Sequence, residues 1–184
     1  SSDLKDIKVV MYAGGLHERY GLKKLTEAFM MLPQENFRLK LFGSGPFVEK
    51  LKTKYTKKDS RIQYMGVAPN AEVVAAELDA SLLVNPRPTH EEFTKYSFPS
   101  KNIEYMASGT PLLTTKLPGM PKEYYPYVFL IENESVEGYA KALESVLAQS
   151  DEELYVFGEK AKDFVLEKKN SFEQAKRVIE LIKL

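Results

Sequence analysis

Lys101 and Glu104 are the pair of residues in this chain whose types and spacing best suit ligand binding. They follow Pro99, which suits the first turn of a helix because its missing N–H would have no partner there. A separation of three residues puts both side chains on one helix face. The free amides of a helix start attract phosphate, and a carboxylate one turn deeper can accept hydrogen bonds from vicinal hydroxyls. Phosphate plus diol indicates a nucleotide; the alternative is an exposed ion pair worth about 0.3 kcal/mol.

The elements around this pair are predicted by apolar runs that alternate with amphipathic stretches. Strand patterns occur at 7–13, 37–43, 62–66, 81–86, 111–115 and 127–132. Helix patterns occur at 21–33, 46–57, 70–78, 98–108 and 135–149. Strands that alternate with helices predict right-handed crossovers and a parallel sheet covered on both faces. We therefore predict an α/β fold with a Rossmann-like, doubly wound parallel sheet of about six strands.

Two helices have clear apolar stripes. In the first, Leu22, Leu25, Ala28 and Phe29 share one face. In the helix that carries the Lys101–Glu104 pair, the stripe expected to be buried consists of Ile103, Met106 and Ala107.

The end of the chain is predicted to be helical only. One stripe runs from Phe157 through Ala161 to Phe164 and Val165, and another runs along 172–182, with a break predicted at 168–170. We expect 1–184 to form a single domain, with 1–6 as a linker and 151–184 as C-terminal helices.

The loops after the first two strands are rich in glycine. Gly14 and Gly15 would leave backbone amides free for phosphate oxygens, or would simply form a tight turn. Gly43 and Gly45 begin a G-x-G-x-x-G pattern, but its third glycine is replaced by Val48. A P-loop sequence is also absent. These two failures count against a dehydrogenase and against an ATPase.

The balance of charges, the absence of cysteine and the lack of long apolar runs exclude several classes of binding partner and site. The 26 basic and 26 acidic residues give no net charge that would favour nucleic acid or an anionic membrane. The chain has no cysteine, which excludes disulfides and zinc–thiolate sites. No apolar run approaches the ~20 residues that cross a bilayer. We therefore expect no nucleic-acid partner.

Several motifs in order resemble one known family. YAGGLHERYG (12–21), FGSGP (42–46), IQYMG (62–66), EYMASGTP (104–111) and PGMPKEY (118–124) are similar to the C-terminal, donor-binding domain of GT-B glycosyltransferases, in particular glycosyltransferase family four. The resemblance extends from about Ile7 to the final helices, and EYMASGTP is its most specific part. It implies one half of a GT-B fold, with the N-terminal acceptor-binding domain absent from this chain.

The resemblance also implies a reaction. Members of this family transfer a sugar from a nucleotide-diphosphate sugar to an acceptor with retention, often in polysaccharide or glycan biosynthesis. No cofactor and no metal are expected, since the Asp-x-Asp motif of the metal-dependent class is missing. We expect a cytoplasmic protein, or one held peripherally at the inner face of the plasma membrane through the missing half. The fragment alone is expected to be inactive.

Carried over to this sequence, the resemblance assigns Glu104 to the ribose hydroxyls. The other glutamate of the family's E-x7-E pair would fall on Tyr96. Tyr96 could itself hydrogen-bond a sugar hydroxyl, or Glu91 or Glu92 could reach in from the preceding loop, so these three are the candidate catalytic residues in this chain. The family's Gly-Phe-Gly segment between the glutamates corresponds here to 97–99, so one amide donor is lost at Pro99.

Two cations that neutralise the diphosphate in the family fall on Gly15 and Tyr20 in this chain. Lys101 is the favoured replacement, with Arg19 and Arg87 as the other candidates. The nucleotide base is expected to meet the main chain of 66–68. The full expected donor-binding set is Gly14, Gly15, Arg19, Gly66, Val67, Arg87, Ser97, Phe98, Ser100, Lys101 and Glu104.

Two other functions stay open on the sequence. A related sugar-nucleotide epimerase would use carboxylate and histidine chemistry, and the chain has only His17 and His90. A non-catalytic binding or scaffold domain would explain the altered phosphate site at Gly15, Tyr20 and Pro99.

Overall fold

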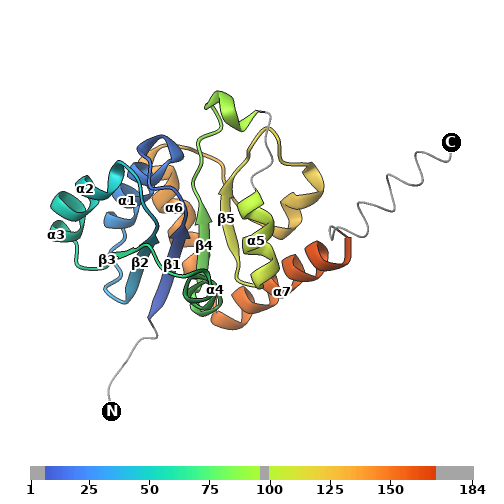
Figure 1. Ribbon diagram of the computed structural model, residues 1–184. Coiled ribbons are helices and arrows are strands. Elements are labelled where there is room, and N and C mark those ends of the chain that lie inside the picture. Colours follow the sequence, from blue (N-terminus) through green and yellow to red (C-terminus); the bar gives the residue numbers. More distant parts are fainter. Residues whose placement is uncertain (1–6, 96–99, 169–184) are drawn as a thin grey trace, which may run out of the picture.

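The computed structural model describes residues 7–95 and 100–168 and contains one parallel sheet with helices on both faces (Figure 1). The strand order is β3-β2-β1-β4-β5-β6, and every pairing is parallel. This order is that of a doubly wound Rossmann-like sheet, so the predicted fold class is confirmed. The strands are β1 (Lys8–Ala13), β2 (Phe37–Phe42), β3 (Ile62–Gly66), β4 (Leu82–Asn85), β5 (Leu112–Thr115) and β6 (Phe129–Ile131).

The helices separate into two layers. One layer contains α1 (Leu22–Met30) and α6 (Val136–Leu147), which pack on each other. The opposite layer contains α4 (Asn70–Asp79), α5 (Ser100–Ser108) and α7 (Asp151–Lys168), with α5 against both α4 and α7. Two separate hydrophobic clusters therefore form, one on each face of the sheet.

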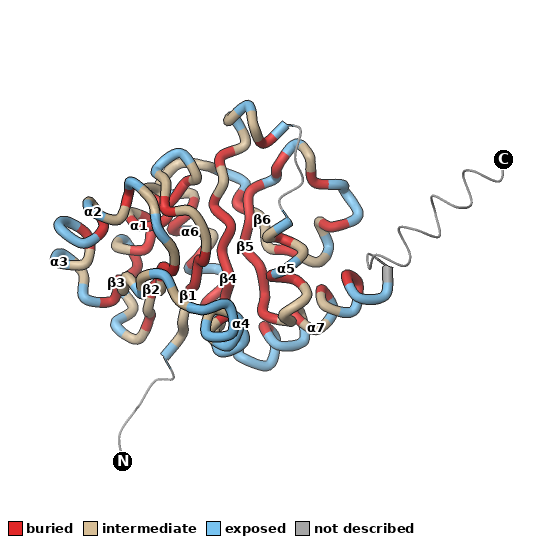
Figure 2. Tube along the Cα trace, in the orientation of Figure 1, coloured by how far each residue is buried: buried red, intermediate tan, exposed pale blue. Residues whose placement is uncertain are grey.

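The central strands are buried along their whole length. All four residues of β4 and all four of β5 are buried, and Figure 2 shows them as a continuous red band. Neighbouring residues of β1 serve opposite faces: Val10 belongs to the cluster under α1 and α6, whereas Met11 belongs to the cluster under α5 and α7. Strands covered on both faces are expected to be nearly continuous apolar runs, which explains why their sequence pattern was so clear.

The predicted helix stripes are buried against the sheet. Leu22, Leu25, Ala28 and Phe29 have no exposed surface, which confirms the stripe of α1. Burial of each of the large apolar side chains contributes about 1.5–3 kcal/mol.

Three of the four residues in the stripe predicted at the start of the C-terminal helices are buried, and the fourth, Phe157, is partly buried. Ala161, Phe164 and Val165 are buried on α7, and the ring of Phe164 stacks on Tyr127 at 4.2 Å between centroids. The second predicted stripe, at 172–182, lies outside the described residues.

The predicted helix at 46–57 is the main departure from the sequence prediction. It consists of α2 (Phe47–Lys50), a π-helical segment η2 (Leu51–Tyr55) and α3 (Thr56–Lys58). Within it Phe47, Leu51 and Tyr55 are all buried, and the Tyr55 hydroxyl donates to the Glu27 carboxylate at 2.9 Å. A π turn adds a residue to the turn, which 3.6-residue periodicity cannot predict.

Three short 3-10 segments were also not predicted, because they carry no apolar period. They are η1 (Glu18–Tyr20), η3 (Glu92–Thr94) and η4 (Lys122–Tyr127). The other predicted elements are confirmed in type, with small differences at their ends. Among the described helices, none combines the length and the apolar composition that crossing a bilayer requires.

Backbone hydrogen bonds join the loops at the carboxyl ends of β1, β2 and β3. The Gly14 amide donates to the Phe42 carbonyl at 3.0 Å, and the Gly43 amide donates to the Gly66 carbonyl at 2.8 Å. Gly43 has a φ of +126°, and a Cβ there would lie 1.9 Å from the Gly14 carbonyl oxygen. No side chain fits at that position, so the three loops can form one continuous floor only with glycine there.

Substitution of Gly43 by alanine tests this floor, and Gly66→Ala is its matched control. Both positions have positive φ, but a Cβ at Gly66 would meet nothing within 4 Å. We expect Gly43→Ala to lower the free energy of unfolding by about 2 kcal/mol or more beyond the loss in Gly66→Ala, because it adds a backbone clash to the same kind of strain. Urea denaturation of both variants measures the difference, and equal losses would contradict the close packing of the loops.

Candidate functional site

A small pocket of about 170 Å³ lies at the carboxyl ends of β1, β2 and β3, between α4 and α5. Open parallel sheets bind their ligands at this edge. Four of the residues predicted from the sequence line the pocket together: Gly14, Val67, Lys101 and Glu104. The other lining residues are Ala13, Phe42, Gly43, Ala68, Asn70 and Val73.

The Lys101–Glu104 pair lies on one face of α5, as its spacing predicted. The Lys101 ammonium is 3.6 Å from the Glu104 carboxylate and 5.2 Å from the centre of the Tyr105 ring. The Lys101 side chain is 25% exposed and that of Glu104 is 47% exposed. Both charged groups can therefore still be reached by a ligand, and their attraction is partly screened by water.

Tyr105 attaches α5 to the end of β1. Its hydroxyl accepts a hydrogen bond from the Ala13 amide at 2.9 Å and donates to the Ala13 carbonyl at 3.2 Å. Burial raises the pKa of this hydroxyl well above its usual value, so it stays protonated and keeps its donor. Lys101 and Glu104 are thereby held beside Gly14, and a Cβ on Gly14 would lie 3.4 Å from the Lys101 Cε.

The buried stripe of α5 differs from the predicted one. Met106 is fully buried, but Ile103 and Ala107 are only partly buried, and Asn102 and Tyr105 lie deepest instead. The prediction was incomplete because it counted apolar residues only. Both polar side chains have buried partners; the Asn102 amide oxygen accepts from the Asn85 side chain at 2.6 Å.

A second group of side chains lies at the neighbouring loops and forms an arginine–aromatic cluster of Arg19, Tyr20, Arg87 and Phe93. The Arg87 guanidinium lies 5.0 Å from the centre of the Tyr20 ring, and that of Arg19 lies 5.3 Å from it. The Tyr20 and Phe93 rings meet edge to face at 5.7 Å. The loop containing η1 and the loop containing η3 thus place two cations at the same rim of the sheet.

Tyr12 lies between this cluster and the pocket. Its hydroxyl donates to the Gly15 carbonyl at 3.1 Å and would be 2.9 Å from a Cβ on Gly14. Burial raises its pKa to about 12, and the positive charge of Arg87 acts in the opposite direction. The Gly14–Gly15 backbone therefore lies beside Lys101 at Gly14 and beside the Tyr20 ring at Gly15, and Arg87 reaches the same ring.

The remaining predicted residues are placed outside the pocket lining or outside the described chain. Gly66 ends β3 next to Val67, and Ser100 begins α5 with its side chain exposed. Tyr96, Ser97 and Phe98 lie outside the described residues.

Glu91 and Glu92, two of the candidates for the role of the family's first glutamate, are not among the residues that line the pocket. Glu91 lies 3.9 Å from the His90 imidazole, and Glu92 is exposed in η3. Neither His90 nor His17, whose ring lies 4.8 Å from that of Tyr20, lines the pocket. The described pocket therefore brings together Lys101 and Glu104 without a second carboxylate in its lining.

Sequence reasoning missed Phe42, Asn70 and Val73 as pocket residues. Phe42 is the last residue of β2, and Asn70 and Val73 lie in the first turn of α4. Their position directly after a strand or at a helix start was the available signal, because ligands bind where those ends meet.

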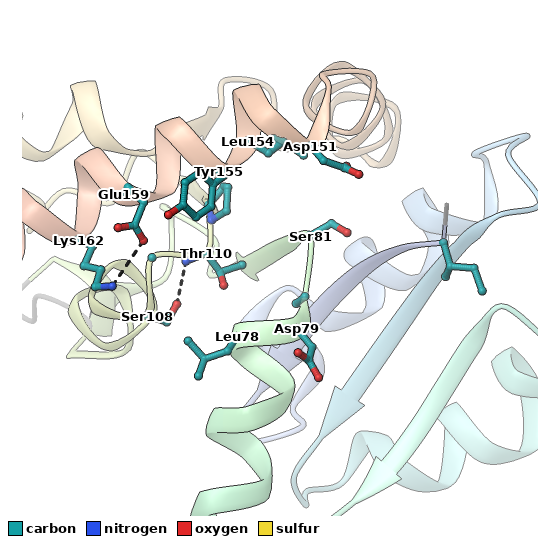
Figure 3. Close-up of a pocket in the computed structure, with 14 residues that line it drawn as sticks. Leu78, Asp79, Ser81, Ser108, Thr110, Asp151, Leu154, Tyr155, Glu159 and Lys162 are labelled. Atoms are coloured by element: carbon teal, nitrogen blue, oxygen red, sulfur yellow. Dashed lines mark hydrogen bonds and ion pairs between the residues drawn. The ribbon is translucent and has the colours of Figure 1, made fainter. Parts of the chain in front are cut away.

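A larger cavity of about 490 Å³ lies at the opposite edge of the sheet (Figure 3). Ile7, Ser81 and Pro111, which directly precede β1, β4 and β5, line it together with residues of α7. It contains none of the predicted ligand-binding residues. Within residues 7–95 and 100–168, no group of three or more acidic or histidine side chains is arranged to hold a metal ion.

The Tyr105 attachment can be tested with Tyr105→Phe. We expect a loss of about 1–3 kcal/mol in the free energy of unfolding, because the buried Ala13 amide would lose its hydrogen-bond acceptor. Tyr155→Phe is the control, since Tyr155 is 64% exposed on α7 and should change stability by less than about 0.5 kcal/mol. Thermal or urea unfolding measures both, and a Tyr105→Phe protein as stable as its parent would contradict the attachment.

Comparison with known proteins gives the family of the chain. The family model "Glycosyl transferases group 1" matches residues 2–164. "Putative colanic acid biosynthesis glycosyltransferase WcaL" of Escherichia coli K12 is 30% identical over 112 residues, which are 58% of this chain and 27% of that protein. The WcaL protein of Salmonella typhimurium is 31% identical over the same length. The chain thus spans about a quarter of the length of these curated relatives.

Solved structures agree with the fold. The C-terminal domain of a glycosyl transferase group 1 family protein (LpcC) from Francisella tularensis has a TM-score of 0.73 at 18% identity, covering 90% of this chain and 87% of that one. Anabaena HepE, solved in complex with UDP and glucose, has a TM-score of 0.76 at 15% identity, covering 97% and 48%. The chain therefore belongs to the glycosyl transferases group 1 family and has the fold of the C-terminal domain of a GT-B glycosyltransferase.

Proposed function

We propose that this domain binds the nucleotide-diphosphate sugar donor of a retaining glycosyltransferase in the pocket between α4 and α5. The proposal rests on one observation: Lys101, Glu104, Gly14 and Val67 line the same pocket at the carboxyl ends of the strands. A cation, a carboxylate and a bare glycine backbone are the groups that phosphates and a ribose diol require.

Glu104 would hold the nucleoside. Its carboxylate is about half exposed at the pocket and can accept two hydrogen bonds from the vicinal hydroxyls of a ribose. Val67 is 75% exposed after β3 and Ala68 follows it in the pocket lining, so the base would contact apolar side chains and main-chain groups there.

The diphosphate would lie along Gly14 and Gly15. Lys101 lies beside Gly14, and Arg87 and Arg19 lie around the Tyr20 ring, which is next to Gly15. These three cations would replace the two that are missing at Gly15 and Tyr20, because a partly buried diphosphate without counter-charges is costly. As the sugar leaves, negative charge grows on the diphosphate, and fixed cations stabilise that charge.

The acceptor would come from a second domain. We propose an N-terminal acceptor-binding domain of the same enzyme as the partner, with the reaction in the cleft between the two, and the WcaL likeness supports a role in polysaccharide biosynthesis. A nucleotide-sugar donor supports a cytoplasmic location. Any contact with the membrane would be made through that second domain. The domain alone would bind the donor but not transfer its sugar, so transfer by the purified domain would contradict the two-domain scheme.

Nucleotide affinity tests the pocket. We expect Lys101→Met and Glu104→Ala each to weaken binding of a nucleotide-diphosphate sugar by about 10-fold to 100-fold, since each removes a hydrogen bond that involves a charged group. Arg87→Met and Arg19→Met show whether the arginines share the diphosphate. Lys57→Met is the control for charge, because Lys57 is exposed on α3 and is not among the residues that line the pocket.

Calorimetric titration with UDP-, GDP- and ADP-sugars gives these affinities. The proposal fails if the parent domain binds no member of the panel, which would favour a scaffold domain. It also fails if Lys101→Met and Glu104→Ala bind as tightly as the parent.

A further inference from the structure

The segment 85–87, at the carboxyl end of β4, is tied to the neighbouring strand β5 by two side chains. The Thr114 hydroxyl donates to the Asn85 carbonyl at 3.1 Å, and the Thr115 hydroxyl donates to the Arg87 carbonyl. Both threonines are fully buried. The pairing of β4 with β5 extends to Asn85 and Thr114, so the bond from Thr115 continues the attachment beyond the end of the ladder.

Pro86, in the middle of this segment, is tied to the helix layer of α1 and α6. Its carbonyl accepts a hydrogen bond from the buried Tyr139 hydroxyl of α6 at 2.8 Å. Burial raises the pKa of that hydroxyl, so it stays protonated and keeps its donor. Gly21 packs so closely against the same carbonyl that a Cβ there would lie 1.8 Å from the oxygen. Three consecutive carbonyls of the segment 85–87 therefore each have a buried donor.

The Asn85 side chain joins the segment to α5. Its amide nitrogen donates to the Asn102 side-chain oxygen at 2.6 Å, and both side chains are fully buried. The outer atoms of the pair are poorly satisfied. The Asn85 Oδ1 has no hydrogen-bond partner among the described residues, and the Asn102 amide nitrogen has the sulfur of Met120 at 3.9 Å. A buried polar pair of this kind adds little stability compared with apolar side chains of the same shape, so its contribution is geometric.

This amide pair connects the two backbones that carry Lys101 and Arg87. Asn102 directly follows Lys101 in the first turn of α5, and Asn85 is two residues before Arg87. The Arg87 guanidinium lies 5.0 Å from the centre of the Tyr20 ring, and within the described chain it forms no ion pair with a carboxylate. Its charge is therefore held at the rim of the sheet and is available to a ligand.

We propose that the segment 85–87 is a rigid support that fixes the distance between Arg87 and Lys101, with Asn85 and Thr115 as positioning residues for the diphosphate. The inference rests on the proposed function, because only there do both cations act on one ligand. Groups that are already in place lose little freedom on binding, and small displacements of such groups weaken binding. Neither Asn85 nor Thr115 lines the pocket, so each acts through the backbone that it holds.

Two threonines near the two ends of β5 provide a matched pair of variants. Thr115→Val and Thr110→Val each remove one buried hydroxyl that donates to a carbonyl of another segment. The acceptor is the Arg87 carbonyl in the first case and the Glu77 carbonyl in the second. Thr110 lies at the opposite edge of the sheet, in the larger cavity (Figure 3). The two variants should therefore lose similar stability but differ in ligand binding.

The readout is the ratio of two affinities. One ligand is the tightest-binding member of the panel of UDP-, GDP- and ADP-sugars, measured by calorimetry. The other is the nucleoside of the same compound, which has no phosphate, measured by NMR titration. We expect Thr115→Val to weaken the sugar nucleotide about threefold to tenfold and the nucleoside less than about twofold. Thr110→Val should leave the ratio unchanged, and a general loss of structure would weaken both ligands alike.

A second variant removes the amide pair without leaving one buried amide alone. Asn85→Leu combined with Asn102→Leu replaces both side chains by apolar ones of similar size, so the stability should stay close to that of the parent. We expect the affinity ratio to fall about tenfold all the same, because the amide pair then no longer joins the segment of Arg87 to α5.

A cycle with Arg87→Met shows whether the threonine acts through the cation. In that background Thr115→Val should lower the affinity for the sugar nucleotide no further, because the guanidinium that it positions is gone. An equal loss with and without Arg87 would show that Thr115 does not position it. Where the nucleoside binds too weakly to measure, this cycle decides the matter.

The outcomes separate this inference from the proposed function. If the parent binds the sugar nucleotide and Thr115→Val lowers the ratio no more than Thr110→Val does, the pocket stands and the inference is wrong. Should the double asparagine variant fail to fold, the pair of threonine variants decides alone. If the parent binds no sugar nucleotide, both proposals fall together.

Discussion

The hydrogen bonds between the Tyr105 hydroxyl and the backbone of Ala13 are the constraint on which the candidate site depends. They join the middle of α5 to the last residue of β1, and they are fully buried. Lys101 is one helical turn before Tyr105, and Glu104 directly precedes it. A fixed Tyr105 therefore also fixes the distances of both residues from Gly14. A hydroxyl that donates and accepts at the same residue satisfies both backbone groups where the strand's own ladder ends.

The loops that contain Gly14 and Gly43 form the surface beside which the Tyr105 attachment places α5. Gly14 and Gly43 bring the ends of β1 and β2 into direct backbone contact, which leaves a bare floor beside α5. Lys101 lies beside Gly14, and Arg87 lies near the Tyr20 ring next to Gly15, although the two cations come from different segments after β4. In the proposed function, these side chains would replace the two cations of the family that align with Gly15 and Tyr20 in this chain.

The sequence predicted the sheet and the Lys101–Glu104 pair because both depend on local spacing. Buried parallel strands are continuous apolar runs, and a helix face follows from 3.6-residue periodicity. The Tyr105 attachment and the arginine–aromatic cluster were not predicted, since they join segments that are far apart in the chain and have no period. Asn102 and η2 were missed for related reasons: one is a polar residue in a buried stripe, and the other breaks the helical period.

Two unfavourable placements lie on neighbouring helices. Lys101 stands in the first turn of α5, where the helix dipole disfavours a cation, and Glu77 is buried in α4 without a full set of partners. Each costs stability when considered alone. In the proposed function, a diphosphate would give Lys101 a second negative partner besides Glu104, and so would offset the first of these costs. Local strain that a bound ligand would relieve is the arrangement expected of a binding site and not of a structural helix pair.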